Sequence, residues 1–139
     1  MVGEIFEYEF VVKETYLDIY SHLNNANYIR IFEEARWDLV QERGFGFQKI
    51  QQTQIGPIIL SLKADFRKEV IGREKIKVVT QVTEYRKKIG KIKQTMYKQN
   101  GLVACEAEFV CALFDLKNRK LMEPTKEWLY AIGWPSEIN

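Results

Sequence analysis

The stretch NYIRIFEEARWDLVQERG, residues 27–44, carries the longest helical pattern in this chain. Apolar side chains recur at helical spacing along one side of it: Tyr28, Phe32, Ala35 and Leu39, with Ile29 and Val40 widening the stripe. Charged side chains take the other side: Arg30, Glu34 and Asp38. Arg43 supplies a basic last turn and Gly44 a stop. The pattern predicts one helix of about five turns, roughly 27 Å long.

Downstream of Gly44 the apolar period changes to the two-residue alternation of strands. In PIILSLKADFRKEV this alternation predicts one apolar set on a single face: Ile58, Leu60, Leu62, Ala64 and Phe66. Strands are predicted at residues 6–14, 57–70, 74–86, 91–99 and 102–116. Gly90 in KKIGK and the pair Asn100-Gly101 predict hairpin turns. A short helix is predicted after Pro124, at residues 125–133.

One long helix with about five strands predicts an α+β fold, in which a curved antiparallel sheet wraps around the helix. Residues 1–139 show no internal repeat or linker, so we expect a single domain. The last strand is apolar on both faces from Phe109 to Phe114, unlike a strand with one solvated face. Either the C-terminal helix or another subunit must cover the outer face. We favour cover by another subunit, and therefore expect a homo-oligomer.

The composition is that of an ordinary soluble protein, with 46% hydrophobic and 29% charged residues. A formal net charge of +2 gives no reason to expect a nucleic-acid partner. No apolar run reaches membrane-spanning length, and the acidic start MVGEIFEYEF resembles neither a signal peptide nor an anchor. We therefore expect a cytoplasmic protein that does not associate with membranes.

Several kinds of site find little support. Cys105 and Cys111 share one predicted strand about 20 Å apart, too far for a disulfide, and are expected to be small buried hydrophobes. His22 is the only histidine, which argues against a zinc site and leaves no metal site predicted. Glu106 and Glu108 are expected to face solvent rather than form a catalytic pair.

The segment DIYSHLNNANY, residues 18–28, is unusually polar for the approach to a helix, because capping requires only one Asn or Asp. Asn24 or Asn25 begins the helix, where unpaired N–H groups favour an oxyanion. Asp18 precedes them as a possible base or nucleophile. Such a site has a base and an oxyanion stabiliser but no strong acid, which suits a thioester with a thiolate leaving group of pKa about 8 to 9. The alternative is that these residues only build turns and a cap.

The spacing of Asp18, His22, Asn24-Asn25 and Tyr28 resembles the active-site signature of hot-dog-fold acyl thioesterases of the 4-hydroxybenzoyl-CoA thioesterase superfamily, including their acyl-ACP relatives. The following IFEEARWDLVQERG looks like the central helix of that family. The sequence departs from one branch, which has His at the position of Asn25 and Tyr at that of Glu14.

The resemblance implies hydrolysis of an acyl-CoA or acyl-ACP thioester by a dimer or tetramer, with coenzyme A only as part of the substrate and no other cofactor. Asp18 would be the general base or nucleophile, and the N–H of Asn25 would polarise the carbonyl. His22 and Asn24 would orient water or Asp18. Tyr28 would line the pocket or brace the loop. A non-catalytic acyl-CoA-binding protein is the alternative from another class.

A CoA substrate also needs cations near its phosphates. The densest cluster is Arg86, Lys87, Lys88 and Lys91, at a predicted hairpin. We expect these residues to bind the nucleotide part of the substrate, although a basic hairpin tip can also serve solubility alone.

Overall fold

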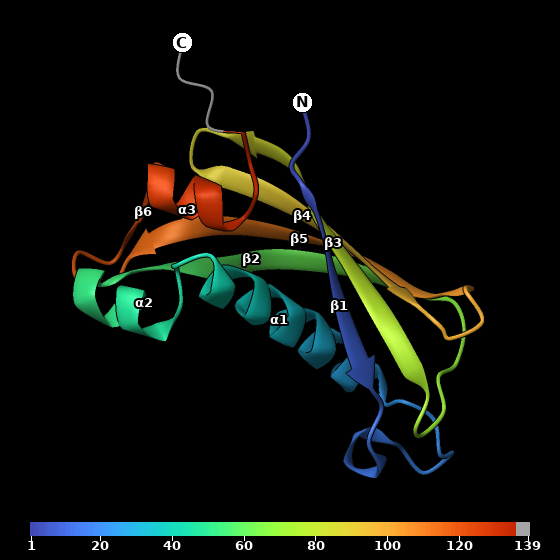
Figure 1. The fold of residues 1–139 in the computed structure, drawn as a ribbon. Coiled ribbons are helices and arrows are strands. Elements are labelled where there is room, and N and C mark those ends of the chain that lie inside the picture. The colour runs from blue at the N-terminus through green and yellow to red at the C-terminus, as the bar shows by residue number, and fades with distance from the viewer. Residues whose placement is uncertain (136–139) are drawn as a thin grey trace.

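The computed structural model describes residues 1–135, which form a curved sheet folded around one long helix (Figure 1). The elements in chain order are β1 (Ile5–Val11), a 3-10 turn (Glu14–Tyr16), α1 (Asn25–Glu42), α2 (Phe47–Thr53), β2 (Ile55–Phe66), β3 (Lys75–Arg86), β4 (Ile89–Tyr97), β5 (Val103–Asp115), β6 (Lys120–Met122) and α3 (Lys126–Ala131). The predicted α+β architecture is confirmed.

The sheet is antiparallel throughout, in the order β1-β3-β4-β5-β2, with β6 added to the end of β5. Its register brings apolar side chains opposite one another on the inner face, as Val78 lies opposite Met96 and Ile92 opposite Phe109. β1 and β2 lie at the two ends of this order, and β6 pairs only with β5.

Helix α1 begins at Asn25, as the Asn24-Asn25 pair predicts, but its last residue is Glu42, so Arg43 lies just beyond the last turn in which it was predicted. Asn24 is the N-cap residue, Arg43 the C-cap residue, and Gly44 follows with a φ of 88°. The buried side of α1 comprises Tyr28, Ile31, Phe32, Ala35, Leu39 and Val40. Phe32 packs edge-on against Phe109 of β5, with 5.9 Å between ring centroids. The apolar stripe thus fixes α1 against the middle of the sheet.

Strand β2 departs from the predicted alternation because it contains a bulge between Ile59 and Ser61. Ile58 lies opposite Ala112, whereas Leu62 lies opposite Phe109, three positions away and on the other face of β5. The prediction that all five apolar residues from Ile58 to Phe66 share one face is therefore wrong. Leu60 is an extra residue that reverses the alternation, and no local sequence pattern indicates this bulge.

The β3–β4 hairpin turns at Lys87 and Lys88, not at Gly90 as predicted. Gly90 lies inside β4 opposite Tyr85, and a Cβ atom at this position would come 2.7 Å from the Tyr85 ring. The glycine therefore permits close packing within the hairpin and does not form its turn. The turn predicted at Asn100-Gly101 is confirmed, with Gly101 at a φ of 88°.

The two faces of β5 are covered differently. Phe109, Cys111 and Leu113 face α1 and are buried, whereas Val110 and Phe114 on the outer face are half-buried. Helix α3 packs on the α1 side of the sheet, where Trp128 lies edge-on against Phe45 at 5.2 Å. It therefore does not cover the outer face, and this alternative is wrong.

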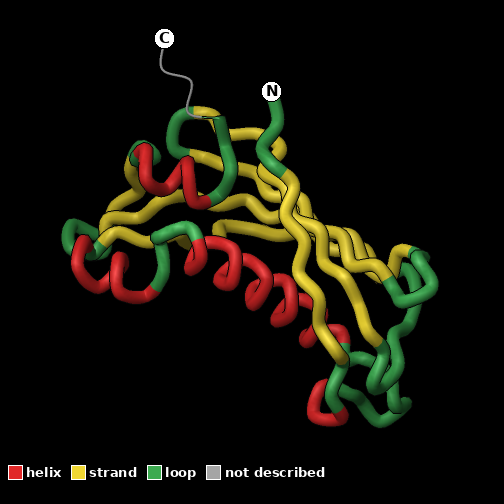
Figure 2. The backbone as a smooth tube through the Cα atoms, in the orientation of Figure 1, coloured by secondary structure: helices red, strands yellow, loops and turns green. Residues whose placement is uncertain are grey.

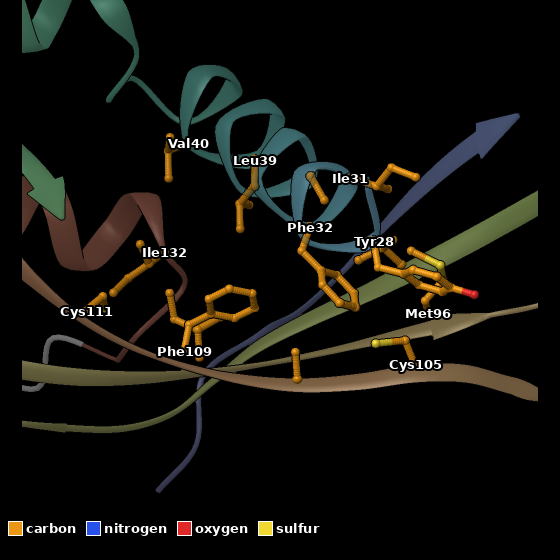
Figure 3. Close-up of a cluster of buried hydrophobic side chains, with 14 of the residues drawn as sticks. Tyr28, Ile31, Phe32, Leu39, Val40, Met96, Cys105, Phe109, Cys111 and Ile132 are labelled. Carbon is orange, nitrogen blue, oxygen red and sulfur yellow. The ribbon is translucent and has the colours of Figure 1, made fainter. Parts of the chain in front are cut away.

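The two cysteines are free and buried, as predicted. Burial raises the pKa of Cys105 to about 12 and the pKa of Cys111 to about 11, so both thiols stay protonated near neutral pH. Figure 3 shows both side chains within the apolar cluster under α1. No helix in residues 1–135 is long and apolar enough to span a membrane.

Candidate active site

A tight loop precedes α1 and carries Asp18, His22 and Asn24, while Asn25 is the first residue of α1 (the loop is green near the first turn of the long helix in Figure 2). Leu17 and Leu23 pair across its base. Inside it, Asp18 N–H donates to the His22 carbonyl at 2.8 Å and Ser21 N–H to the Asp18 carbonyl at 3.0 Å. Ser21 adopts a φ of 64°, which the tight turn requires. The loop is thus held by its own backbone.

The carboxylate of Asp18 divides its two oxygens between different surroundings. Its Oδ1 accepts hydrogen bonds from the N–H groups of Tyr20 at 2.8 Å and His22 at 3.2 Å. Its Oδ2 has no hydrogen-bond partner in the described part of the chain. One oxygen therefore builds the turn, and the other remains available for chemistry.

The first turn of α1 leaves one N–H group unused. Asn24 caps the helix by accepting from Ala26 N–H at 2.8 Å through its side chain, and its carbonyl accepts from Asn27 N–H at 2.9 Å. The N–H of Asn25 donates to no acceptor within residues 1–135. A free N–H at a helix N-terminus is a donor for an anionic oxygen.

The side chain of His22 points to a residue that sequence reasoning did not identify. Its Nδ1 lies 3.2 Å from a carboxylate oxygen of Glu69, whereas His22 contacts Asp18 through its backbone N–H and carbonyl. The surrounding backbone explains the approach, because Leu23 N–H donates to the Val70 carbonyl at 2.7 Å and His22 bridges to Ile71. These contacts join segments 47 residues apart, and no local sequence signal indicates them.

Tyr28 is buried, with 4% of its surface exposed, and its hydroxyl donates to the Lys68 carbonyl at 3.1 Å. Its ring meets Phe66 edge-on at 5.2 Å. Burial raises the pKa of Tyr28 to about 12, so the hydroxyl remains a neutral donor. The side chain thus ties α1 to the end of β2 beside the loop.

These residues surround one open depression of about 590 Å³. It is lined by Asp18, Tyr20, His22, Leu23, Asn24, Asn25, Tyr28, Phe66, Arg67, Lys68 and Glu69. All five residues of the predicted motif lie here, together with two cations that sequence reasoning did not select. Arg67 pairs with Glu106 at 2.7 Å, which leaves Lys68 as the cation without a carboxylate partner in residues 1–135.

The predicted phosphate-binding cations are not at this depression. Arg86, Lys87, Lys88 and Lys91 lie at the β3–β4 hairpin. Strand β3 starts near the loop and runs for 12 residues, about 40 Å, before it reaches that hairpin. Figure 1 shows the hairpin and the loop at opposite ends of the sheet. Within one chain these cations and Asp18 are not neighbours.

Besides the Glu69 carboxylate that holds His22, the depression therefore offers the second oxygen of Asp18 and the Asn25 N–H, both without a partner in residues 1–135, and no strong acid. Residues 1–135 contain no group of three or more His, Cys, Asp or Glu side chains placed to hold a metal ion. This arrangement can activate water or attack a carbonyl carbon while the N–H stabilises the negative oxygen. It is suited to a substrate whose leaving group departs without protonation.

Comparison with known proteins agrees with this chemistry. The long-chain acyl-CoA thioesterase FadM of Escherichia coli is 28% identical over 112 residues, 80% of this chain and 84% of FadM. A Staphylococcus aureus protein solved in complex with CoA superimposes with a TM-score of 0.85 at 17% identity, over 99% of this chain and 90% of that one. A 1,4-dihydroxy-2-naphthoyl-CoA thioesterase from Synechocystis gives 0.85 at 15% identity, over 93% and 96%.

The fold shared with these solved proteins is the hot-dog fold, as the sequence resemblance implied. The family model that matches this chain covers residues 12–132, from the end of β1 to the end of α3 and including the whole Asp18 loop. The chain therefore belongs to the thioesterase-like superfamily.

Proposed function

We propose that this protein hydrolyses an acyl-CoA thioester to a free acid and CoA. The observation that carries the proposal is that one depression contains an Asp18 oxygen and an Asn25 N–H, neither of which has a hydrogen-bond partner within residues 1–135. FadM supports the reaction, and the CoA complex of the Staphylococcus protein supports the carrier.

Two chemical routes use the same groups. In one, Asp18 takes a proton from water while the water oxygen bonds to the thioester carbon. In the other, an Asp18 oxygen bonds to that carbon, and water later cleaves the resulting anhydride. In both, charge collects on the carbonyl oxygen and Asn25 N–H donates to it. The C–S bond then breaks, and the sulfur leaves with the electron pair as a thiolate, which is stable because the pKa of a thiol is about 8.5.

The remaining residues of the depression would position these groups. Glu69 holds the His22 ring at 3.2 Å, and the cap on Asn24 fixes the direction of the Asn25 N–H. Lys68 supplies a positive charge at the rim, suited to a phosphate of CoA. The free thiols of Cys105 and Cys111 suit a reducing compartment, which supports action in the cytoplasm.

The proposal includes a homodimer formed through β2. This edge strand of 12 residues exposes Ile59, Leu60, Leu62 and Phe66 by 39 to 51%. A long apolar edge with unpaired N–H and C=O groups is a template for another strand. A second copy offers the same edge, and the two can pair antiparallel about a two-fold axis. Pairing near the middle of β2 would bring the Phe66 end of one strand beside the Ile55 end of the other.

The test is release of CoA thiol by the purified protein from a panel of acyl-CoA substrates, followed with a thiol reagent. We expect multiple turnovers with at least one acyl-CoA. Tight binding of the whole panel without thiol release would instead identify a non-catalytic acyl-CoA-binding protein. Release only from acylated carrier protein would assign the carrier as ACP.

A further inference from the structure

A second hollow lies at the other end of α1. It is a cavity of about 170 Å³ between the C-terminal half of α1 and the sheet. Its apolar walls include Leu39, Val40, Val82, Ile92, Cys111 and Ile132. Figure 3 shows Leu39, Val40, Cys111 and Ile132 on one side of Phe32, and Tyr28 with Cys105 on the other. Within one chain, packed core therefore separates this cavity from the Asp18 loop.

Arg36 is the cation in the wall of this cavity. Its guanidinium lies 4.2 Å over the Phe109 ring, and its Nη1 donates to Gln94 Oε1 at 2.8 Å. No carboxylate in residues 1–135 forms a salt bridge with it, since the neighbouring Glu33 accepts instead from Trp37 Nε1 at 3.2 Å. Burial lowers the pKa of Arg36 to about 10. A half-buried cation whose acceptor is neutral gains from an added oxygen ligand.

The remaining N–H groups of Arg36 are available to such a ligand. Residues 1–135 contain no fully buried side-chain nitrogen or oxygen without a partner, so the unused guanidinium nitrogens border open space. The position of the guanidinium is fixed from behind. Gln94 is fully buried, and its side-chain nitrogen donates to Thr80 Oγ1 and to the Phe32 carbonyl, both at 3.0 Å. Its Oε1 accepts the hydrogen bond from Arg36.

The cavity also sets the size of its occupant. An apolar protein cavity of about 150 Å³ holds one benzene molecule. A cavity of about 170 Å³ thus suits one six-membered ring or a chain of similar size. The walls are mostly apolar, and their charged groups are Arg36 and the Glu33 carboxylate, which is engaged by Trp37. Such a cavity suits a compact apolar group that carries an oxygen acceptor for Arg36.

The mouth of the cavity lies on the β2 side. Trp37 and Ile59 line it, and each is 39% exposed. In the proposed dimer the Phe66 end of one β2, beside the Asp18 depression, lies next to the partner's Ile55 end, beside the partner's cavity. An acyl group held at one Asn25 can therefore extend into the other subunit.

We propose that the Arg36 cavity receives the far end of the acyl group from the partner's active site and selects acyl groups that carry an oxygen there. This inference rests on the proposed function and on the dimer. It predicts a graded preference, in which a terminal carboxylate exceeds a hydroxyl and both exceed a plain end, because hydrogen bonds to charged groups are the stronger ones.

The test compares matched CoA thioesters: hexanoyl with 6-hydroxyhexanoyl and adipoyl, and benzoyl with 4-hydroxybenzoyl and 4-carboxybenzoyl. We expect kcat/KM for the oxygenated members to exceed that for the plain ones by at least about tenfold. Arg36→Met should bring this ratio close to one, and Arg36→Lys should leave an intermediate ratio. Arg30→Met, which replaces an exposed arginine on the same helix, should leave the ratio unchanged. Equal rates for plain and oxygenated thioesters, or equal losses on both in Arg36→Met, would overturn the assignment.

Mixing two defective proteins tests the path between subunits. A dimer of one Asp18→Asn and one Arg36→Met chain would contain one site with both native residues if the acyl group crosses the two-fold axis. Random mixing should then restore roughly a quarter of wild-type activity on the oxygenated thioester. No recovery would place Arg36 in the same chain as its Asp18 and refute the crossing.

Binding separates this inference from the proposed function. If no thioester is hydrolysed, the proposed function fails, and calorimetry with the same thioesters decides the inference alone. Tighter binding of the oxygenated members to the wild-type protein than to Arg36→Met would support the Arg36 cavity. Equal binding by both proteins would overturn it.

Discussion

At the scale of single residues, Asp18 is the group on which the proposed chemistry depends. Replacing it with Asn keeps an Oδ1 acceptor for Tyr20 and His22, so the turn should persist. It removes the charge and basicity of the other oxygen. We expect kcat to fall by at least about 10²-fold, while the melting temperature changes little. Thiol-release kinetics with a thermal melt on the same preparation measures both.

The His22 substitution provides the comparison. His22→Ala removes a ring that contacts Glu69 rather than the Asp18 carboxylate, so it should cost less activity than Asp18→Asn. Near-normal kcat in Asp18→Asn would return the loop to a purely structural role. A larger loss in His22→Ala than in Asp18→Asn would transfer the central role to the histidine.

At the scale of elements, the N-terminus of α1 allows the Asn25 N–H to be removed with little change to the rest of the helix. Asn25 is the first helical residue, where proline is well tolerated, and Asn24 before it has the extended ψ of 140° that a following proline prefers. Asn25→Pro should lower kcat by about 10² to 10³-fold, the cost of one oxyanion donor, without loss of helix or melting temperature. Asn25→Ala keeps the N–H and should remain active. Full activity in the proline variant would exclude this donor.

The β3–β4 hairpin carries a separate prediction about the carrier. Arg86→Ala with Lys88→Ala should raise KM for acyl-CoA and spare an acyl-cysteamine substrate without the nucleotide, if the hairpin of one subunit reaches the CoA bound by the other. Lys68→Ala, at the rim of the depression itself, gives the reference effect. Equal changes on both substrates would remove the hairpin from CoA binding.

The elements also show what sequence reasoning can reach. The stripe from Tyr28 to Leu39 predicted α1 because helical periodicity is local, and alternation predicted five strands for the same reason. The bulge at Leu60, the seven-residue α2 and the three-residue β6 were missed because each is too short to show a period. The contact of Glu69 with His22 depends on chain folding, which no spacing records.

At the scale of the whole molecule, the exposed β2 edge predicts a dimer. Leu60→Lys with Leu62→Lys places charges on this edge and should yield monomers, because like charges would face each other across the two-fold axis. Activity should fall as the dimer is lost, since each site is proposed to use the partner's cavity. Light scattering at micromolar concentration gives the mass. Leu102→Lys is the matched control, because Leu102 is 51% exposed but lies outside β2. A monomeric wild-type protein with full activity would contradict the proposed dimer.

The hydrogen bond from Leu23 N–H to the Val70 carbonyl has a consequence for the timing of catalysis. It joins the Asp18 loop to the β2–β3 connection, so the loop cannot open without breaking contacts to a second segment. Amide protons of surface loops ordinarily exchange with solvent quickly, but those engaged in such contacts exchange only when the whole unit opens. We expect the amide proton of Leu23 to exchange as slowly as the amide protons of the sheet strands, whereas that of Ile19 should exchange fast. A loop that opens so rarely does not act as a lid. Products would therefore leave the depression without movement of the Asp18 loop.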